Sequence, residues 1–112
     1  MHEVGLMQDA LGICFDAARR GNAKRISRIA MRIGELSGAE PEALRFAFEA
    51  MSQGTIAEHA SIEFERTRVG RRCLGCGADF DGRSEADPCP QCGAKNSIRT
   101  GFEIQVASID VD

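Results

Sequence analysis

The stretch Cys73-Leu74-Gly75-Cys76, followed by Cys89-Pro90-Gln91-Cys92, decides how this 112-residue chain is organised. Twelve residues separate the two pairs, and a glycine (Gly77 or Gly93) directly follows each pair. A two-residue spacer lets two thiolates reach one metal ion, and the glycine permits the turn that brings backbone amides toward sulfur. Four thiolates around Zn²⁺ make a closed tetrahedral site with no position for a substrate. The sequence therefore predicts a structural zinc ion held by Cys73, Cys76, Cys89 and Cys92.

Two disulfides in a small secreted domain are the alternative interpretation of these four cysteines. The chain does not open with a basic region followed by an apolar core, as a signal peptide would. Paired Cys-x-x-Cys motifs at this separation are typical of zinc sites. We therefore expect zinc rather than disulfides, and a reducing, cytoplasmic location.

Length and composition indicate one domain, or one small domain carrying a metal-stapled insertion. Hydrophobic residues make up 43% of the chain, Trp and Tyr are absent, and 14 Lys and Arg face 17 Asp and Glu. A nucleic-acid binder normally shows a basic excess and stacking aromatic residues. No apolar run approaches the roughly 18 residues of a membrane span. Composition therefore argues against both nucleic-acid and membrane partners.

A helix is expected over residues 4–20, because apolar side chains recur there every three or four positions. This stripe consists of Val4, Met7, Leu11, Cys14 and Ala18. Because Cys14 lies within the stripe, we expect it to be a small buried hydrophobe rather than a reactive thiol. Gly21-Asn22 is predicted to end the helix.

Strands are expected over residues 25–36, 60–68 and 102–111, and a second helix from Pro41 to about residue 54. In the first strand Ile29, Met31 and Ile33 alternate with more polar residues, which predicts one buried face. The last strand changes the phase of its apolar residues, which indicates a bulge near Val106 or burial on both faces.

The order of these elements predicts an α+β fold, α/β only in the loose sense. Three strands form a sheet covered by two helices, and the zinc ribbon is inserted before the last strand. We therefore expect one domain to comprise residues 1–68 and 100–112, and the zinc-ribbon domain to comprise residues 69–99.

The first three residues, Met1-His2-Glu3, offer several nitrogen ligands to a metal. An α-amine and an imidazole both lose protons near neutral pH. The His2 amide nitrogen closes a five-membered chelate ring with the α-amine and a six-membered ring with its own Nδ1. The Glu3 amide is an alternative to the amine, because a square plane gives the His2 amide only two cis neighbours. A fourth ligand must come from elsewhere, with the carboxylate of Glu3 as one candidate and Glu40 as a weaker one.

Nitrogen ligands in a square plane suit Ni(II) or Cu(II) better than Zn²⁺. An incomplete ligand set suits a carrier that must pass its ion on. The alternative is that His2 is only a frayed terminal residue. The chain's other histidine, His59, has no ligand partner near it in sequence, and we expect it to be solvated.

Met1-His2-Glu3 opens an apolar helix, Ile33-Gly34-Glu35-Leu36-Ser37-Gly38 precedes Pro41-Glu42-Ala43-Leu44, and the two cysteine pairs follow. In this order the three features resemble the HypA family of nickel metallochaperones in [NiFe]-hydrogenase maturation, which includes the HybF paralogues. The resemblance covers essentially the whole chain. Some members carry histidines beside the zinc cysteines, where this chain has Gly77 and Gly93.

The resemblance implies nickel binding by His2 and its neighbours Met1 and Glu3, in the domain formed by residues 1–68 and 100–112. It also implies zinc at the four ribbon cysteines, and work alongside a HypB-type GTPase and the hydrogenase large subunit. Some relatives serve urease, and the residues here do not choose between the two clients.

Two other classes of protein are weighed against this one. A zinc-ribbon module that binds nucleic acid or protein is supported by one basic cluster, which consists of Arg66, Arg68, Arg71 and Arg72. A solvated strand end explains the cluster equally well. An enzyme is not indicated, because the sequence contains no P-loop, no nucleophile motif and no open metal site with a general base.

Overall fold

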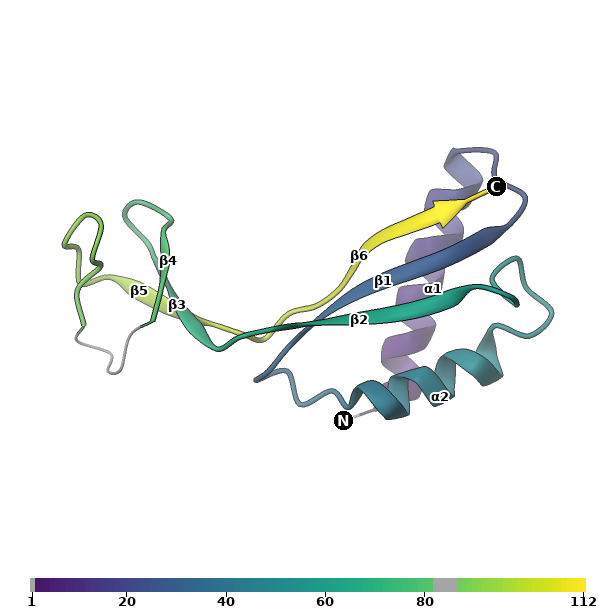
Figure 1. The fold of residues 1–112 in the computed structure, drawn as a ribbon, viewed down its shortest axis with the longest axis horizontal. Coiled ribbons are helices and arrows are strands. Elements are labelled where there is room, and N and C mark those ends of the chain that lie inside the picture. The colour runs from purple at the N-terminus through teal and green to yellow at the C-terminus, as the bar shows by residue number, and fades with distance from the viewer. Residues whose placement is uncertain (1, 82–86) are drawn as a thin grey trace.

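In the computed structural model, which describes residues 2–81 and 87–112, two three-stranded sheets lie end to end along the longest axis (Figure 1). The molecule measures 52 × 28 × 17 Å. The first sheet has the order β2 (Ser61–Thr67), β1 (Ile26–Gly34), β6 (Ile104–Val111). The second has the order β4 (Asp79–Phe80), β3 (Gly70–Cys73), β5 (Ser97–Thr100). The predicted insertion of a ribbon between the second strand and the last strand of the first sheet is thus confirmed.

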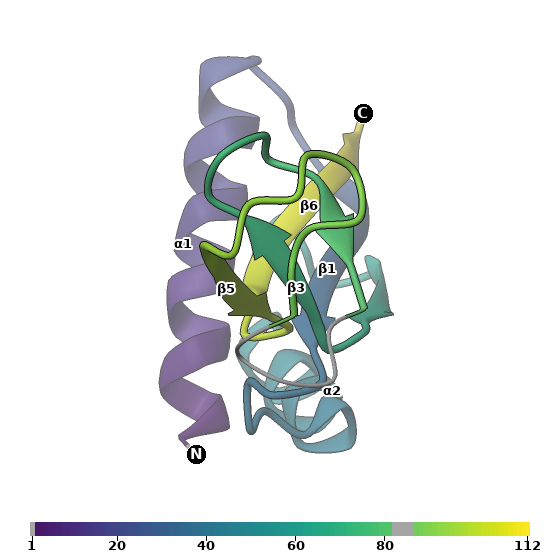
Figure 2. The same cartoon turned by 90° about the vertical axis from the view of Figure 1, so that its left-hand side faces the viewer.

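Helix α1 (Glu3–Arg20) buries the predicted stripe, except at its first member. The helix packs against α2 and β6 (Figure 2). Cys14 is 1% exposed, and burial raises the pKa of its thiol to about 11, as expected of an inert core cysteine. Val4 is 63% exposed, so its predicted burial is wrong. Val4 lies in the first turn of α1, on the side of the helix that borders an open hollow beside α2.

Strand β1 forms the centre of the first sheet, parallel to β2 and antiparallel to β6. Ile29, Met31 and Ile33 are buried and join the core formed with the helices, as the alternation predicted. The opposite face carries charges. There Arg28 pairs with Glu63 of β2 at 3.0 Å and with Asp110 of β6 at 3.3 Å.

The last strand contains the predicted irregularity. Ala30 is paired with Ser108, but the next residue, Met31, is paired with Val106, which leaves Ala107 as the extra residue of a bulge. The strand begins at Ile104 rather than at Phe102, which is exposed in the connection before it.

Helix α2 (Pro41–Met51) begins with proline in its first turn, as predicted, and ends at Met51, before the expected residue 54. Leu44, Ala47 and Phe48 face the core. The half-buried Arg45 of α2 donates a hydrogen bond to the carbonyl of Ile62 at 3.0 Å. This contact covers part of the free edge of β2.

Candidate metal centres

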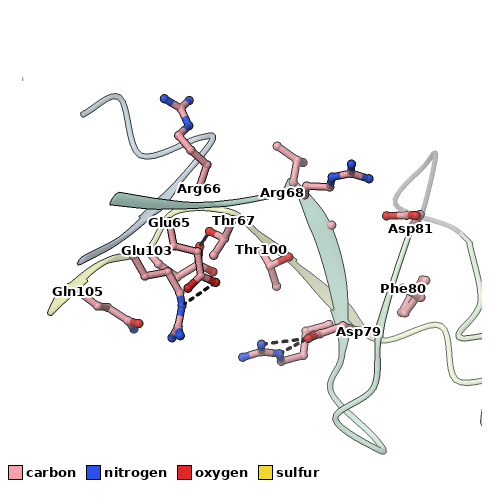
Figure 3. A pocket seen from close by; sticks show the side chains of 14 residues that line it. Glu65, Arg66, Thr67, Arg68, Asp79, Phe80, Asp81, Thr100, Glu103 and Gln105 are labelled. Atoms are coloured by element: carbon pink, nitrogen blue, oxygen red, sulfur yellow. Dashed lines mark hydrogen bonds and ion pairs between the residues drawn. The ribbon is translucent and has the colours of Figure 1, made fainter. Parts of the chain in front are cut away.

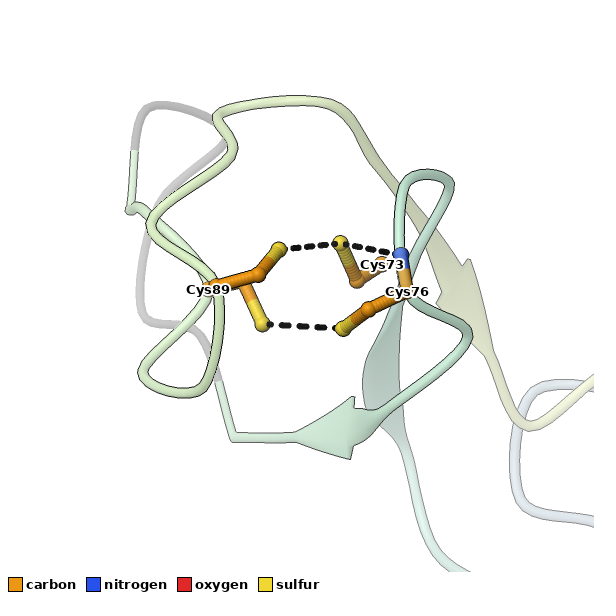
Figure 4. Close-up of side chains that lie close together, drawn as sticks. Cys73, Cys76 and Cys89 are labelled. Carbon is orange, nitrogen blue, oxygen red and sulfur yellow. Dashed lines mark hydrogen bonds between the residues drawn. The ribbon is translucent and has the colours of Figure 1, made fainter.

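The two cysteine pairs converge at the far end of the second sheet, where their four sulfur atoms all lie within 4.8 Å of one another (Figure 4). The Sγ atoms of Cys73 and Cys92 are 3.5 Å apart, and those of Cys76 and Cys89 are 3.7 Å apart. A tetrahedron with Zn–S bonds of about 2.3 Å has edges of about 3.8 Å. All five cysteines lie within the described residues, and none forms a disulfide. The cluster therefore has the donors and the dimensions of a closed Cys₄ zinc site.

The local backbone explains why the pairs take this shape. The amides of Gly75 and Cys76 donate to the Cys73 sulfur at 3.3 and 3.4 Å. In the second pair the amide of Gln91 donates to Cys89 Sγ at 3.4 Å. Gly77 and Gly93 have φ of 78° and 75°, a left-handed conformation that glycine adopts without steric cost. The predicted role of these two glycines in the turns is confirmed.

The electrostatics of the cluster suit a bound cation. The backbone amides of Cys76 and Gly75, with neighbouring thiols, lower the pKa of Cys73 to about 6. The amides of Cys92 and Gln91 likewise lower the pKa of Cys89. The Ala78 amide also lowers the pKa of Cys76, but the thiols around it and its burial raise that pKa to about 12. Four thiolates this close repel one another, whereas a bound Zn²⁺ would deprotonate all four.

The second group of residues singled out from the sequence lies at the start of α1, away from the ribbon and near the middle of the longest axis (Figure 1). His2 is exposed and immediately precedes α1, and its carbonyl accepts the Leu6 amide at 3.1 Å. The Glu3 carboxylate accepts the amide of Glu40 at 3.3 Å. The structure thus brings Glu3 beside Glu40 at the start of both helices. Met1, the remaining candidate ligand, lies outside the described residues.

An open hollow of about 410 Å³ lies beside this terminus. It is lined by His2, Glu3, Val4, Ala43, Phe46 and Ala47. Phe46 is 76% exposed, an unusual position for a large apolar side chain. Sequence reasoning missed this surface. Helical periodicity assigns Phe46 to the outer side of α2, but it does not show that Val4 of α1 lies next to it.

Residues 1–111 match the family model HypA, described as "Hydrogenase/urease nickel incorporation, metallochaperone". The chain belongs to the HypA family. It is 40% identical to the hydrogenase maturation factor HypA of Picosynechococcus sp. over 112 residues, or 99% of each chain. Identity to the factor of the same name from Geobacter sulfurreducens is 38% over 113 residues, covering 100% of both chains.

Solved HypA structures share the fold. The solution structure of the nickel metallochaperone HypA from Helicobacter pylori superposes with a TM-score of 0.72 at 25% identity, over 99% of this chain and 97% of that one. A second HypA solution structure gives a TM-score of 0.77, also at 25% identity. HypA proteins are nickel metallochaperones, and the Cys₄ cluster fits structural zinc.

The basic cluster that supports nucleic-acid binding is divided by the HypA fold. Arg72 pairs with Asp79 at 2.8 Å, and the buried Arg71 donates to Ser97 Oγ at 2.8 Å. Arg66 and Arg68 border a groove of about 680 Å³ between the two sheets (Figure 3). The groove is also lined by acidic residues, which are Glu65, Asp79, Asp81 and Glu103. A surface of mixed charge does not suit a polyanion, so nucleic-acid binding is not favoured.

His59 is exposed, as predicted. In residues 2–81 and 87–112, the four ribbon cysteines are the only cluster of three or more metal-ligating side chains. None of the described helices is long and apolar enough to span a membrane.

Proposed function

We propose that this chain binds Ni(II) at its N-terminus and delivers it during [NiFe]-hydrogenase maturation, while Cys73, Cys76, Cys89 and Cys92 hold structural zinc. The observation that carries the proposal is the position of His2 in a HypA-family chain. His2 is exposed ahead of α1, and the carboxylate of the next residue, Glu3, accepts the backbone amide of Glu40. An exposed site at a chain end is accessible to an acceptor, as a cargo metal requires.

The start of α1 favours amide ligation of nickel. The first four amides of a helix have no helical acceptor, so removing the proton of the Glu3 amide breaks no helical bond. The positive end of the helix dipole also stabilises the resulting negative nitrogen. We propose His2 amide nitrogen and Nδ1 as two ligands, with the third from the Met1 amine or the Glu3 amide. The free oxygen of the Glu3 carboxylate is a candidate for the fourth.

Zinc has a separate task in this proposal. A closed Cys₄ shell leaves zinc without a substrate position, so it orders residues 69–99 as a ribbon domain. Residues 1–68 and 100–112 form the nickel-binding domain. We propose that the chain performs no catalysis itself, since a metallochaperone transfers its ion by ligand exchange.

The partners follow from this role. The similar hydrogenase maturation factors support delivery to the hydrogenase large subunit. The sequence resemblance supports a HypB-type GTPase as co-worker. The exposed Val4 and Phe46 line the same hollow as His2 and provide apolar surface for protein contact beside the proposed nickel site. We propose a cytoplasmic protein without nucleic-acid or membrane partners, in keeping with its reduced cysteines.

Calorimetric nickel titration of untagged, zinc-loaded protein tests the proposal. His2→Ala should abolish specific nickel binding, because it removes the imidazole donor. His59→Ala is the matched control, since His59 is also an exposed histidine but lies far from the terminus in sequence. It should bind nickel like the wild type. Equal nickel affinity in His2→Ala and wild type would place the site elsewhere.

A further inference from the structure

Two short linkers connect the two sheets. Residues 68–69 join β2 to β3, and residues 101–103 join β5 to β6. Strand pairing stops on either side of the junction, at Gly70 with Thr100 in the ribbon and at Ile33 with Ile104 in the first sheet. What holds the ribbon in its orientation must therefore lie in the linkers and in the segments that touch them.

Backbone hydrogen bonds tie the last residue of β2 and the linker of residues 101–103 to the residues that follow β1. Glu35 donates to the carbonyl of Thr67 at 2.9 Å, and Leu36 donates to the carbonyl of Gly101 at 2.6 Å. The approach is so close that a Cβ on Gly34 would collide with the carbonyl of Gly101. Gly101 itself has φ of 111°, a conformation that other residues rarely adopt.

One side chain connects the end of β2 to the linker that precedes β6. The Glu103 carboxylate accepts the Thr67 hydroxyl at 2.5 Å through one oxygen and the Gly101 amide at 3.2 Å through the other (Figure 3). The Thr67 hydroxyl, the backbone amides and the nearby Arg72 guanidinium lower the pKa of Glu103. The carboxylate is therefore charged at neutral pH, and both hydrogen bonds are of the stronger, charge-assisted kind.

We propose that Glu103 is a clasp that fixes the zinc ribbon relative to the first sheet. Thr67 is the last residue before the chain leaves the first sheet for the ribbon, and Glu103 is the last residue before it re-enters that sheet. Their contact therefore holds together the two points from which the linkers extend. Both residues also line the groove between the sheets, which makes the shape of that groove depend on the clasp. The proposal is independent of where nickel binds.

The experiment compares wild-type and Glu103→Ala protein, full length and zinc-loaded, by ¹⁵N relaxation and by tryptic cleavage after Arg68. In the wild type, amides of both sheets should report one common rotational diffusion tensor. In Glu103→Ala the ribbon amides should tumble faster than those of the first sheet. Cleavage after Arg68 should be about tenfold faster, the effect of removing one charge-assisted hydrogen bond.

Glu65→Ala is the matched control. Its carboxylate lines the same groove and pairs with Arg32 at 3.6 Å, but neither partner lies in a linker. It should leave ribbon tumbling and cleavage unchanged. If Glu103→Ala disrupts the fold of the first sheet, Thr67→Val is used in its place, because this change only exchanges the hydroxyl for a methyl group. Wild-type tumbling and cleavage in a folded Glu103→Ala or Thr67→Val variant would overturn the proposal.

Discussion

The zinc ribbon and the N-terminus present metal donors in opposite ways. At the ribbon end, four side chains from two turns meet with their sulfur atoms within 4.8 Å, and backbone amides orient two of them. At the N-terminus, the proposed ligands belong to consecutive residues at the start of α1, where His2 is exposed and α2 adds only the Glu40 amide and the apolar wall of the adjacent hollow. The first arrangement suits a metal that stays, and the second suits a metal that is passed on.

Removal of one ribbon cysteine should have the largest effect. Cys76→Ser should lose zinc and unfold the ribbon, since structural zinc contributes roughly 10–16 kcal/mol of apparent binding energy in small domains. The first sheet should remain folded. Metal analysis and protease mapping measure both outcomes.

Cys14→Ala is the control for that variant, because Cys14 is the one cysteine outside the cluster and is buried in the helical core. It should retain one zinc per chain. A Cys76→Ser ribbon that remained zinc-loaded and protease-resistant would contradict the assignment of the ribbon cysteines as a structural zinc site.

Acidification should have the next largest effect, and it should weaken the nickel site but not the zinc site. Nickel affinity should fall by roughly a hundredfold from pH 8 to pH 6, because amine and imidazole must each lose a proton before they bind metal. Zinc should be retained over the same range, since the bound ion keeps its thiolates deprotonated. Titration of nickel and analysis of zinc at each pH provide the comparison. Loss of both metals over the same pH range would contradict the proposed difference between the two sites.

An extra residue before Met1 should have a smaller effect, and its size identifies the third nickel ligand. The extension turns the primary amine into a peptide nitrogen, which is a far weaker acid. If the amine binds nickel, affinity should fall by about tenfold or more, and the d–d absorption bands should shift. An unchanged spectrum and affinity would assign the third position to the Glu3 amide. Zinc content is the internal control.

The smallest effect is expected from Glu3→Ala. The change removes the exposed hydrogen bond to the Glu40 amide, worth about 0.5 kcal/mol of folding free energy. Urea unfolding measures the loss, with Glu42→Ala in the first turn of α2 as the control. A loss above about 2 kcal/mol would show that this contact supports the core as well as the terminus.

The sequence predicted those features that depend on local pattern. The cysteine spacing predicted the ribbon cluster, and the phase change in the last strand predicted the bulge that the structure places at Ala107. The alternation in β1 also predicted its buried face, and Pro41 predicted where α2 begins. In each case the determining residues are close in sequence, or are cysteines whose spacing has few explanations.

Features that depend on tertiary contact were not predictable. Val4 belongs to an apolar stripe, yet it is exposed because it lines an open hollow beside α2 rather than the core. The Glu103 contact joins residues 36 positions apart, and neither residue type signals it. The ligand roles of Met1, His2 and Glu3 remain proposals, since they rest on chain position and family resemblance.

The central claim is that the two metals occupy separate sites, one for retention and one for transfer. Its most direct test is a chelator challenge of untagged protein loaded with one nickel and one zinc per chain, with both metals measured in wild type and His2→Ala. We predict that wild type loses nickel while it keeps zinc, and that His2→Ala holds zinc alone from the start. Nickel retained by His2→Ala, or nickel that displaces zinc from the cysteines, would contradict the account.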